Sequence, residues 1–353
     1  MKEFVAAVAS DETYLLGAIG TLASLRLSLP EEIDLTVVFL HDGLTDQSQN
    51  LCRVAIENLK GKTTIRFERI MADFSKFPRF PGATQLTYAR LLLPKLVNYK
   101  RIVYLDVDLL ICKDIQSLMD CEVSEIGLAA VVDRGILTIK GDFHPNCEFQ
   151  MELNQPYFNG GLMVMDIEKV RESKIFDKAL EHLNSHPEFC KLWDQSAMNY
   201  VANGRFRILE EFFNFLNSRY YCSPVEFIQP LLNRKINVHF VSKQKPWRFY
   251  SSHPPETIYR ILMDLILPGW KTKAFRKTEL LWKFRMCFVD IHPIIFRFRA
   301  TIKKMFGQKW QSDLWAAENW STKSRDFSEL NKNSDSLKKL YSGWQNQIKT
   351  RLL

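Results

Sequence analysis

Short apolar runs alternate with amphipathic stretches along most of the chain. Residues 4–9 and 34–40 are apolar runs of the length of buried strands. Residues 13–29 and 46–59 place apolar side chains three or four positions apart, which predicts helices. Further strands are predicted at 64–67, 101–105, 127–132, 158–165 and 236–240, and further helices at 87–93, 168–184 and 193–203. Strands that alternate with helices through short loops indicate an α/β fold with a single, mostly parallel sheet flanked by helices.

The pattern changes near Pro268 and Gly269. Beyond this point the strand-like runs disappear and the sequence becomes basic and then polar. We therefore predict a domain over residues 1–268 and a basic, helical C-terminal extension over residues 269–353. Its last part, residues 311–353, is expected to form one or two helices.

Length, composition and cysteine content narrow the class of protein. The chain has 353 residues, 46% hydrophobic and 25% charged, which is enough to bury a core without disulfides or a structural metal. Its seven cysteines are odd in number and include no CxxC pair, so a disulfide framework and a zinc ribbon are not expected, and a reducing cytosol fits better. No apolar run reaches 18 residues and the first apolar run is too short for a signal peptide, so neither a membrane span nor a leader is expected.

The positive charge is concentrated in one segment. The formal net charge is +8, and residues 271–309 alone hold eleven Lys or Arg beside two acidic residues. The same segment carries bulky apolar side chains, among them Leu280, Phe284 and Phe298. This combination suits a membrane interface that contains anionic lipid. A solvated basic helix packed on the body is the alternative, and nucleic acid is not expected because no binding motif for it accompanies the charge.

The segment Tyr104-Leu105-Asp106-Val107-Asp108 is the clearest candidate for chemistry. In an extended chain, residues two apart face the same side, so Asp106 and Asp108 would project together from the end of strand 101–105. Ligands of open α/β sheets bind at the carboxyl ends of strands. Two carboxylates at this place suit Mg²⁺ or Mn²⁺ bound together with substrate phosphates.

Two other interpretations of the Asp pair remain open. Phosphatases of the haloacid dehalogenase class also place Asp-x-Asp after an apolar strand. They continue with Gly-Thr, which forms the turn around the phosphate, whereas Leu109 and Leu110 follow here. An Asp pair that caps a neighbouring helix would need no ligand at all.

Other polar motifs follow or open predicted elements. His239 lies in an apolar stretch and would complete a metal site with the Asp pair, with Lys245 near phosphate oxygens; a hydrogen-bonded core histidine is the alternative. Two glycines in Asn159-Gly160-Gly161 permit close approach of a ligand, or form a bulge. Asp194-Gln195 opens a predicted helix, of which Asp194 is otherwise the N-cap. The turn after the first strand ends in Tyr14, an aromatic that can stack on a base.

In this order, these motifs together resemble glycosyltransferase family 8, which includes bacterial lipopolysaccharide galactosyl- and glucosyltransferases and the glycogenins. The resemblance covers about residues 4–250. The motifs that carry it are the turn ending in Tyr14, Thr87-Tyr88-Ala89-Arg90, the Asp-x-Asp, Asp133 after a strand, Asn159-Gly160-Gly161, Asp194-Gln195, and His239 followed by Lys245-Pro246-Trp247.

The resemblance implies a GT-A fold over the domain of residues 1–268 and a transferase that retains anomeric configuration. It implies UDP-galactose or UDP-glucose as donor and Mn²⁺, with Mg²⁺ as the alternative, held by Asp106, Asp108 and His239. It implies contacts with the donor. Val8, Ser10, Asp11 and Tyr14 would contact uridine, Arg90 and Asp133 the sugar or ribose side, Asn159, Gly160, Asp194 and Gln195 the transferred sugar, and Lys245 the diphosphate. Val107, between the two aspartates, is also expected to bind the donor.

Among these residues, the resemblance implies that the catalytic ones are Gln195, Asp194 and Asp133. Gln195 would lie nearest the anomeric carbon and give electrostatic support, because an amide is a poor nucleophile. Covalent attack by Asp194 is the alternative. The metal and Lys245 would stabilise charge on the departing UDP.

The acceptor implied is a lipopolysaccharide or other lipid-linked glycan. The location implied is cytoplasmic, with the chain attached peripherally to the inner face of the membrane through its basic C-terminal region. A metal-dependent phosphohydrolase and a non-catalytic sugar-nucleotide-binding protein remain the alternatives to a transferase.

Overall fold

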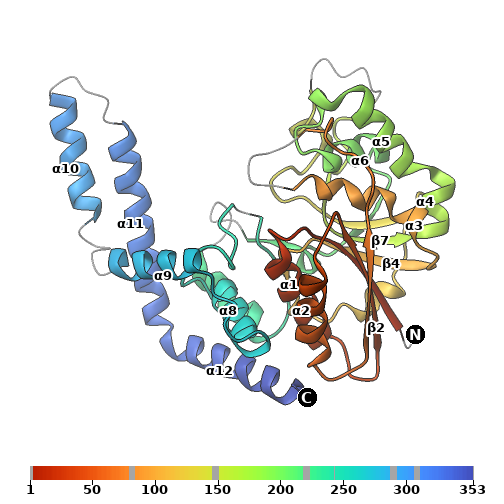
Figure 1. Ribbon diagram of the computed structural model, residues 1–353. Helices are drawn as coiled ribbons and strands as arrows, with labels where there is room; N and C mark the ends of the chain where they lie inside the picture. The colour runs from red at the N-terminus through yellow and green to blue at the C-terminus, as the bar shows by residue number, and fades with distance from the viewer. Residues whose placement is uncertain are drawn as a thin grey trace. The chain divides into compact units, whose positions relative to one another are not determined.

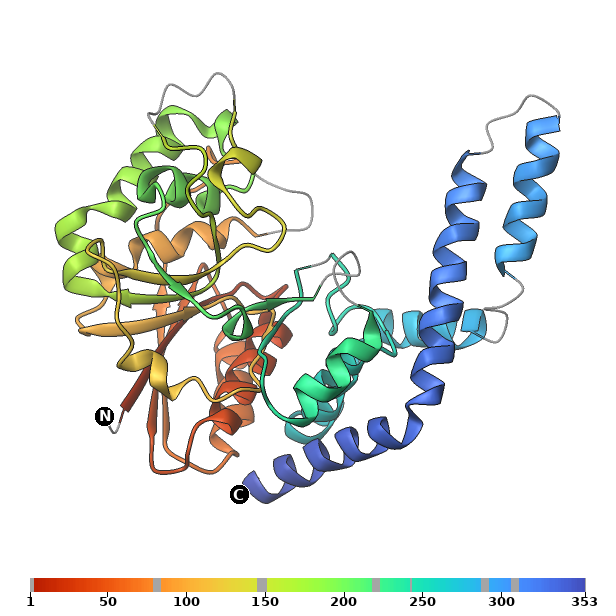
Figure 2. The ribbon, with the colours of Figure 1, turned by 180° about the vertical axis from the view of Figure 1, so that it is seen from behind.

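The computed structural model describes residues 3–78, 84–144, 151–217, 223–241, 243–286, 292–305 and 311–352 (Figures 1 and 2). Parts of the loop 77–82 and of the basic segment 271–309 lie outside these ranges. The chain forms two compact units, each described by itself below. The first unit is Met1–Asn217, Arg234–Lys243 and Ile348–Leu353, and the second is Ser218–Asn233 and Gln244–Gln347. The predicted boundary at residue 268 separates a donor-binding domain from the C-terminal extension. This functional division of the chain stays a prediction.

A seven-stranded sheet forms the centre of the first unit. Its strand order is β3-β2-β1-β4-β7-β6-β8, and β7 alone of these seven runs antiparallel to its neighbours. The mostly parallel α/β sheet expected from the sequence is therefore confirmed. The strands are β1 (Glu3–Ala9), β2 (Asp34–His41), β3 (Thr63–Arg69), β4 (Arg101–Leu105), β6 (Leu128–Val132), β7 (Phe158–Asp166) and β8 (Arg207–Leu209).

Helices cover both faces of this sheet (Figures 1 and 2). On one face lie α1 (Leu15–Ser28) and α2 (Asp46–Glu57), and on the other lie η1 (Gln85–Leu92), α3 (Leu93–Leu96), α4 (Ile167–Ser173), α5 (Ile175–Ser185) and α6 (Asp194–Ala202). All nine residues of β7 are buried, as expected for a strand covered on both faces. The site described below lies where β4 ends beside the beginning of β7, its antiparallel neighbour.

A second, three-stranded sheet brings a distant segment to the end of β4. Its order is β5-β10-β9, with β5 (Leu109–Leu110), β9 (Phe215–Leu216) and β10 (Val238–His239). His239 pairs with Leu109, and the backbone N–H of Phe240 donates to the carbonyl of Asp108 at 2.9 Å. The strand expected over 236–240 is thus only two residues long, and its pairing fixes His239 beside the Asp pair.

Two predicted helices differ from the structure. The helix expected over 168–184 is interrupted at Lys174, whose φ of 54° is left-handed and separates α4 from α5. The apolar positions Ile167 and Val170 are out of helical phase with Ile175, Phe176 and Ala179, so the sequence carries a change of phase at the break that the prediction of one helix missed. The helix expected over 87–93 is the 3₁₀ helix η1, and Pro94 lies in the first turn of α3, where its missing N–H is not needed.

The second unit is helical. Its helices are η6 (Pro224–Phe227), α7 (Ile228–Leu232), α8 (Pro254–Ile266), α9 (Lys273–Met286), α10 (His292–Met305), α11 (Gln311–Lys332) and α12 (Ser334–Arg351), the last of which continues into the first unit. Trp270 links α8 to α9, because its indole donates to Asp264 at 2.8 Å and its ring lies 4.9 Å from that of Phe275. The one or two helices expected after residue 311 are two in the structure, α11 and α12. None of the helices, as far as they are described, is long and apolar enough to cross a bilayer.

Candidate metal and donor-binding site

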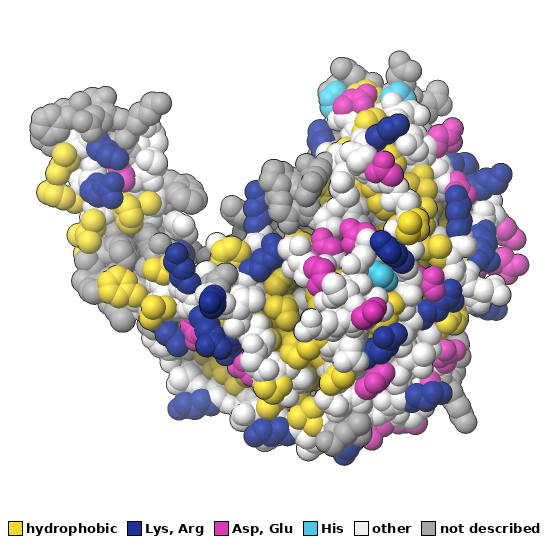
Figure 3. Space-filling model, in the orientation of Figure 1, with side chains coloured by type: hydrophobic (Ala, Val, Ile, Leu, Met, Phe, Trp, Pro, Cys, Tyr) yellow, Lys and Arg dark blue, Asp and Glu magenta, His cyan; other side chains and the backbone are white. Residues whose placement is uncertain are grey.

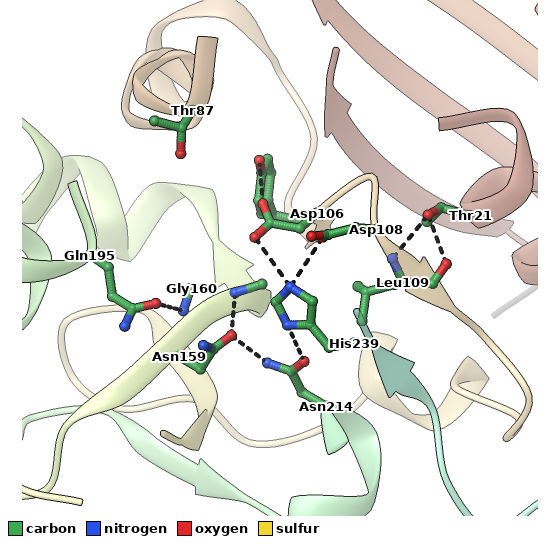
Figure 4. Close-up of polar contacts among 12 residues, drawn as sticks. Thr21, Thr87, Asp106, Asp108, Leu109, Asn159, Gly160, Gln195, Asn214 and His239 are labelled. Carbon is green, nitrogen blue, oxygen red and sulfur yellow. Dashed lines mark hydrogen bonds and ion pairs between the residues drawn. The ribbon is translucent and has the colours of Figure 1, made fainter. Parts of the chain in front are cut away.

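Two aspartates and a histidine meet at the carboxyl end of β4 (Figure 4). Asp106 and Asp108 follow β4 directly, and His239 comes from β10. His239 Nε2 lies 3.1 Å from Asp108 Oδ1 and 3.9 Å from Asp106 Oδ2. Each of the three residues offers one possible ligand atom, and these three atoms all lie within 4.8 Å of one another. Two carboxylates and an imidazole form a donor set that fits Mn²⁺ or Mg²⁺.

Gly161 on β7 makes room for the histidine. A Cβ atom at this position would lie 2.2 Å from His239 Cε1 and 2.6 Å from His239 Nδ1, far inside van der Waals contact. The carbonyl of Gly161 also accepts the backbone N–H of Asp106 at 2.8 Å. The second glycine of the Asn-Gly-Gly motif is therefore needed for the packing of the metal-site histidine against β7.

Arg90 and Tyr104 orient the first aspartate. The Tyr104 hydroxyl donates to Asp106 Oδ1 at 3.0 Å, and Arg90 Nη1 donates to the same oxygen at 3.2 Å. Arg90 Nη1 also donates to the carbonyl of Gly160 at 2.7 Å, so it ties β7 to the end of β4. Sequence reasoning did not single out Tyr104, because a strand tyrosine has no distinguishing pattern.

The rest of the Arg90 guanidinium is bonded to Asp194 and Thr87. Arg90 Nη2 donates to the Thr87 hydroxyl at 2.7 Å, and Nε and Nη2 both donate to the Asp194 carboxylate. Burial is the largest influence on the pKa of Asp194 and raises it, while Arg90 acts in the opposite direction. Burial also acts to lower the pKa of Arg90, but Asp194 and Asp106 outweigh it and raise that pKa. An arginine side chain has five N–H groups, and Arg90 makes five hydrogen bonds within the protein, so all its donors are engaged.

An amide network lines the other side of the site. The amide group of Asn159 donates to Asp133 Oδ2 at 2.8 Å, and that of Gln195 donates to the same oxygen at 3.2 Å. The amide oxygens accept backbone N–H groups, Gly161 to Asn159 at 2.9 Å and Gly160 to Gln195 at 2.9 Å. The backbone N–H groups of Gly160 and Gly161 thus hold the two amide oxygens, and Asp133, which follows β6, accepts a hydrogen bond from both amide NH₂ groups.

The turn after β1 lies at the same edge of the sheet, because β1 and β4 are parallel neighbours. Asp11 Oδ1 accepts the backbone N–H of Tyr14 at 3.0 Å, and the Ser10 hydroxyl donates to the carbonyl of Asp11 at 3.0 Å. Val8 and Ser10 are fully buried, whereas Asp11 and Tyr14 are partly exposed. The structure therefore brings this turn to the edge that carries the Asp pair.

Two candidate residues are placed differently from the others. Val107 lies between the two aspartates with its side chain buried. Lys245 belongs to the second compact unit, where its side chain is buried, and its expected contact with the diphosphate stays a prediction.

Asp194 is not an N-cap, because Trp193 precedes the first turn of α6 and Asp194 points its carboxylate to Arg90.

This arrangement of a mostly parallel sheet with an Asp-Asp-His cluster at the strand ends is that of a GT-A glycosyltransferase. The sequence model of glycosyl transferase family 8 matches residues 5–251, and the chain belongs to this family. It is accordingly a glycosyltransferase.

Individual relatives agree with the family. General stress protein A of Bacillus subtilis is 26% identical over 260 residues, which cover 69% of this chain and 87% of that protein. Lipopolysaccharide 1,3-galactosyltransferase of Salmonella typhimurium is 25% identical over 265 residues, which cover 71% of this chain and 75% of that protein. The crystal structure of galactosyltransferase LgtC in complex with donor and acceptor sugar analogues superposes with a TM-score of 0.62 at 20% identity, covering 78% of this chain and 100% of LgtC. The shared structure shows the GT-A fold.

Proposed function

We propose that this glycosyltransferase moves a hexose from UDP-galactose or UDP-glucose to a lipopolysaccharide or other cell-surface glycan, with retention of anomeric configuration and with Mn²⁺ as cofactor. The observation that carries the proposal is the convergence of Asp106, Asp108 and His239 at the carboxyl end of β4. Mg²⁺ is the alternative ion, since the same oxygen-rich donor set suits it. The relatives named for lipopolysaccharide transfer support the choice of acceptor.

The proposed donor site extends from the turn after β1 to the amide network. Uridine would lie on Tyr14 beside Val8, Ser10 and Asp11, and the diphosphate would lie at the Asp pair with Val107 and Lys245. The transferred hexose would contact Asn159, Gly160 and Gln195, with Asp133 behind them. Arg90 has all its N–H groups engaged within the protein, so we assign it to positioning Asp106 rather than to binding the sugar.

The proposed chemistry rests on groups that are already oriented before the donor binds. A divalent ion, when bound, neutralises charge on the diphosphate of the departing UDP. Gln195 is held by Gly160 and Asp133, so it presents a fixed dipole to the sugar at no reorganisation cost. Asp194 is fully buried and bonded to Arg90, which opposes its use as a covalent nucleophile. We therefore favour attack by the acceptor hydroxyl on the face from which UDP departs.

The proposed location is the cytoplasmic face of the inner membrane. On the face shown in Figure 3, hydrophobic side chains of α9 and α10 are exposed beside Lys and Arg. Ile294, Phe298 and Ile302 are spaced four residues apart on α10 and are 67%, 67% and 39% exposed. An apolar helix face flanked by basic residues suits shallow insertion into a surface that contains anionic lipid.

The direct test is UDP release from a panel of UDP-sugars with Mn²⁺ or with a chelator. We expect slow release of UDP from one hexose donor by hydrolysis to free sugar. With a glycan acceptor we expect faster release of UDP by transfer of the hexose to the acceptor, and in both cases only with the metal present. Changes at residues that only orient a metal ligand lower metal affinity or activity roughly 10–100-fold. Asp108→Asn alters a ligand itself, so we expect it to lower the rate of UDP release by more than that. Asp114→Asn is the matched control, because Asp114 is exposed and contacts only its local turn among the hydrogen bonds described.

The products separate this proposal from the alternatives. Release of inorganic phosphate or of a sugar phosphate in place of UDP would indicate a phosphohydrolase. Binding of UDP without turnover of any donor, even with acceptors present, would indicate a sugar-nucleotide-binding protein and would contradict the proposal.

A further inference from the structure

Asn214 connects the metal-site histidine to the amide network (Figure 4). It directly precedes β9, is 1% exposed, and its side chain lies between His239 and Asn159. Its amide oxygen is 2.9 Å from His239 Nδ1, and its amide nitrogen is 2.8 Å from Asn159 Oδ1. No sequence motif includes Asn214, so its role emerges only from the way β9 and β10 meet β7.

The direction of each hydrogen bond in this chain follows from one backbone group. The N–H of Gly161 can only donate, so the atom of Asn159 that faces it at 2.9 Å must be the amide oxygen. The same oxygen faces Asn214, which must therefore present its NH₂ group. The carbonyl oxygen of Asn214 is then the atom that faces His239 Nδ1, and since this oxygen only accepts, Nδ1 must carry a proton.

We propose that Asn214 is a positioning residue that keeps the proton of His239 on Nδ1 and so leaves Nε2 as the metal-binding atom. This proposal rests on the metal site proposed above. A neutral imidazole has one donor nitrogen and one acceptor nitrogen, so a proton fixed on Nδ1 leaves the Nε2 lone pair facing Asp106 and Asp108. Metal-bound histidines are commonly fixed in this way by a hydrogen bond to the other ring nitrogen.

Loss of Asn214 would favour the opposite tautomer. His239 Nε2 lies 3.1 Å from Asp108 Oδ1, so a proton on Nε2 would be accepted by that carboxylate. In Asn214→Leu, which has similar volume and no polar atoms, Nδ1 loses its acceptor and the proton moves to Nε2. That proton would occupy the position at which a metal ion must bind.

The first test is nitrogen-15 NMR of histidine in the full-length protein without metal. In the wild type we expect the His239 Nδ1 to be protonated, and in Asn214→Leu we expect Nδ1 to be unprotonated and Nε2 protonated. An unprotonated Nδ1 in the wild type would overturn the proposal without any variant. A protonated Nδ1 in a neutral ring of a folded Asn214→Leu protein would overturn it as well.

The second test is Mn²⁺ affinity, measured by electron paramagnetic resonance of the free ion. We expect Asn214→Leu to bind Mn²⁺ roughly 10–100-fold more weakly than the wild type. Asn237→Leu is the matched control: Asn237 is an equally buried amide of the same small sheet, bonded to the backbone of Cys112, Lys113 and Phe213, and we expect less than a twofold change. Equal weakening in both variants would overturn the proposal. If the wild type binds no Mn²⁺, the proposed function fails, while the NMR result still decides the role of Asn214.

Discussion

At the scale of single residues, the metal-site candidates are positioned by neighbours that the sequence does not mark. Asp106 and Asp108 could be predicted because an apolar strand runs directly into them. His239 could be predicted only from the combined motif order, since a lone histidine in a strand is more often a hydrogen-bonded core residue. Asn214 and Tyr104 could not be predicted, because their contacts depend on how separate strands meet in space.

Gly161 provides the residue-scale prediction. Gly161→Ala places a methyl group where the His239 ring lies, so the ring must rotate away from the Asp pair. We expect metal-dependent UDP release to fall at least tenfold, as for other losses of metal-ligand orientation. Gly343→Ala in α12 is the control, because a Cβ there meets no atom within 4 Å. Unchanged turnover in Gly161→Ala would show that the position of His239 against β7 does not matter for activity.

At the scale of elements, hydrophobic pattern predicted where strands and helices lie better than where they break. The buried strands β1, β2, β4 and β7 were all located, because each contains a mainly apolar run. The short β8 was not predicted, since its residues are largely exposed. The division of α4 from α5 was missed because the predicted range has only one apolar residue, Val170, before the left-handed Lys174, too few to make the change of helical phase evident.

Lys174 provides the element-scale prediction. Lys174→Gly removes the steric cost of a side chain in the left-handed region, which exceeds the added entropy of the unfolded chain. We expect the free energy of unfolding to rise by about 0.5–1 kcal/mol in a denaturant titration. Lys178→Gly, an equally exposed lysine inside α5, should instead lower it by about 1 kcal/mol. A loss of stability in Lys174→Gly would contradict the assigned break between the helices.

At the scale of the whole molecule, the fold class and the uneven distribution of charge could be predicted from the sequence. Which apolar side chains are exposed is known only from the structure. The basic segment was evident from its composition. Which of its apolar residues face solvent depends on helix packing, as in α10, where Asp313 of α11 pairs with Lys303 at 2.6 Å and Arg299 at 3.5 Å on a different face from Ile294 and Phe298.

The proposed membrane surface provides the prediction at this scale. We expect the full chain to bind vesicles that contain anionic phosphatidylglycerol and to bind purely zwitterionic vesicles weakly. The double variant Ile294→Ser/Phe298→Ser should bind the anionic vesicles at least tenfold more weakly in a sedimentation assay, because two large apolar side chains no longer insert. Val54→Ser, at an exposed apolar residue of α2, is the control. Equal binding by all three proteins would contradict a role for α10.

Binding of UDP measured by calorimetry tests the central claim most directly, namely that Asp106, Asp108 and His239 hold a divalent ion that binds the diphosphate. We predict that the wild type binds UDP in the presence of Mn²⁺, and that affinity falls at least tenfold with a chelator or in Asp108→Asn. UDP binding of equal strength in the wild type with Mn²⁺, in the wild type with a chelator and in Asp108→Asn would contradict the account.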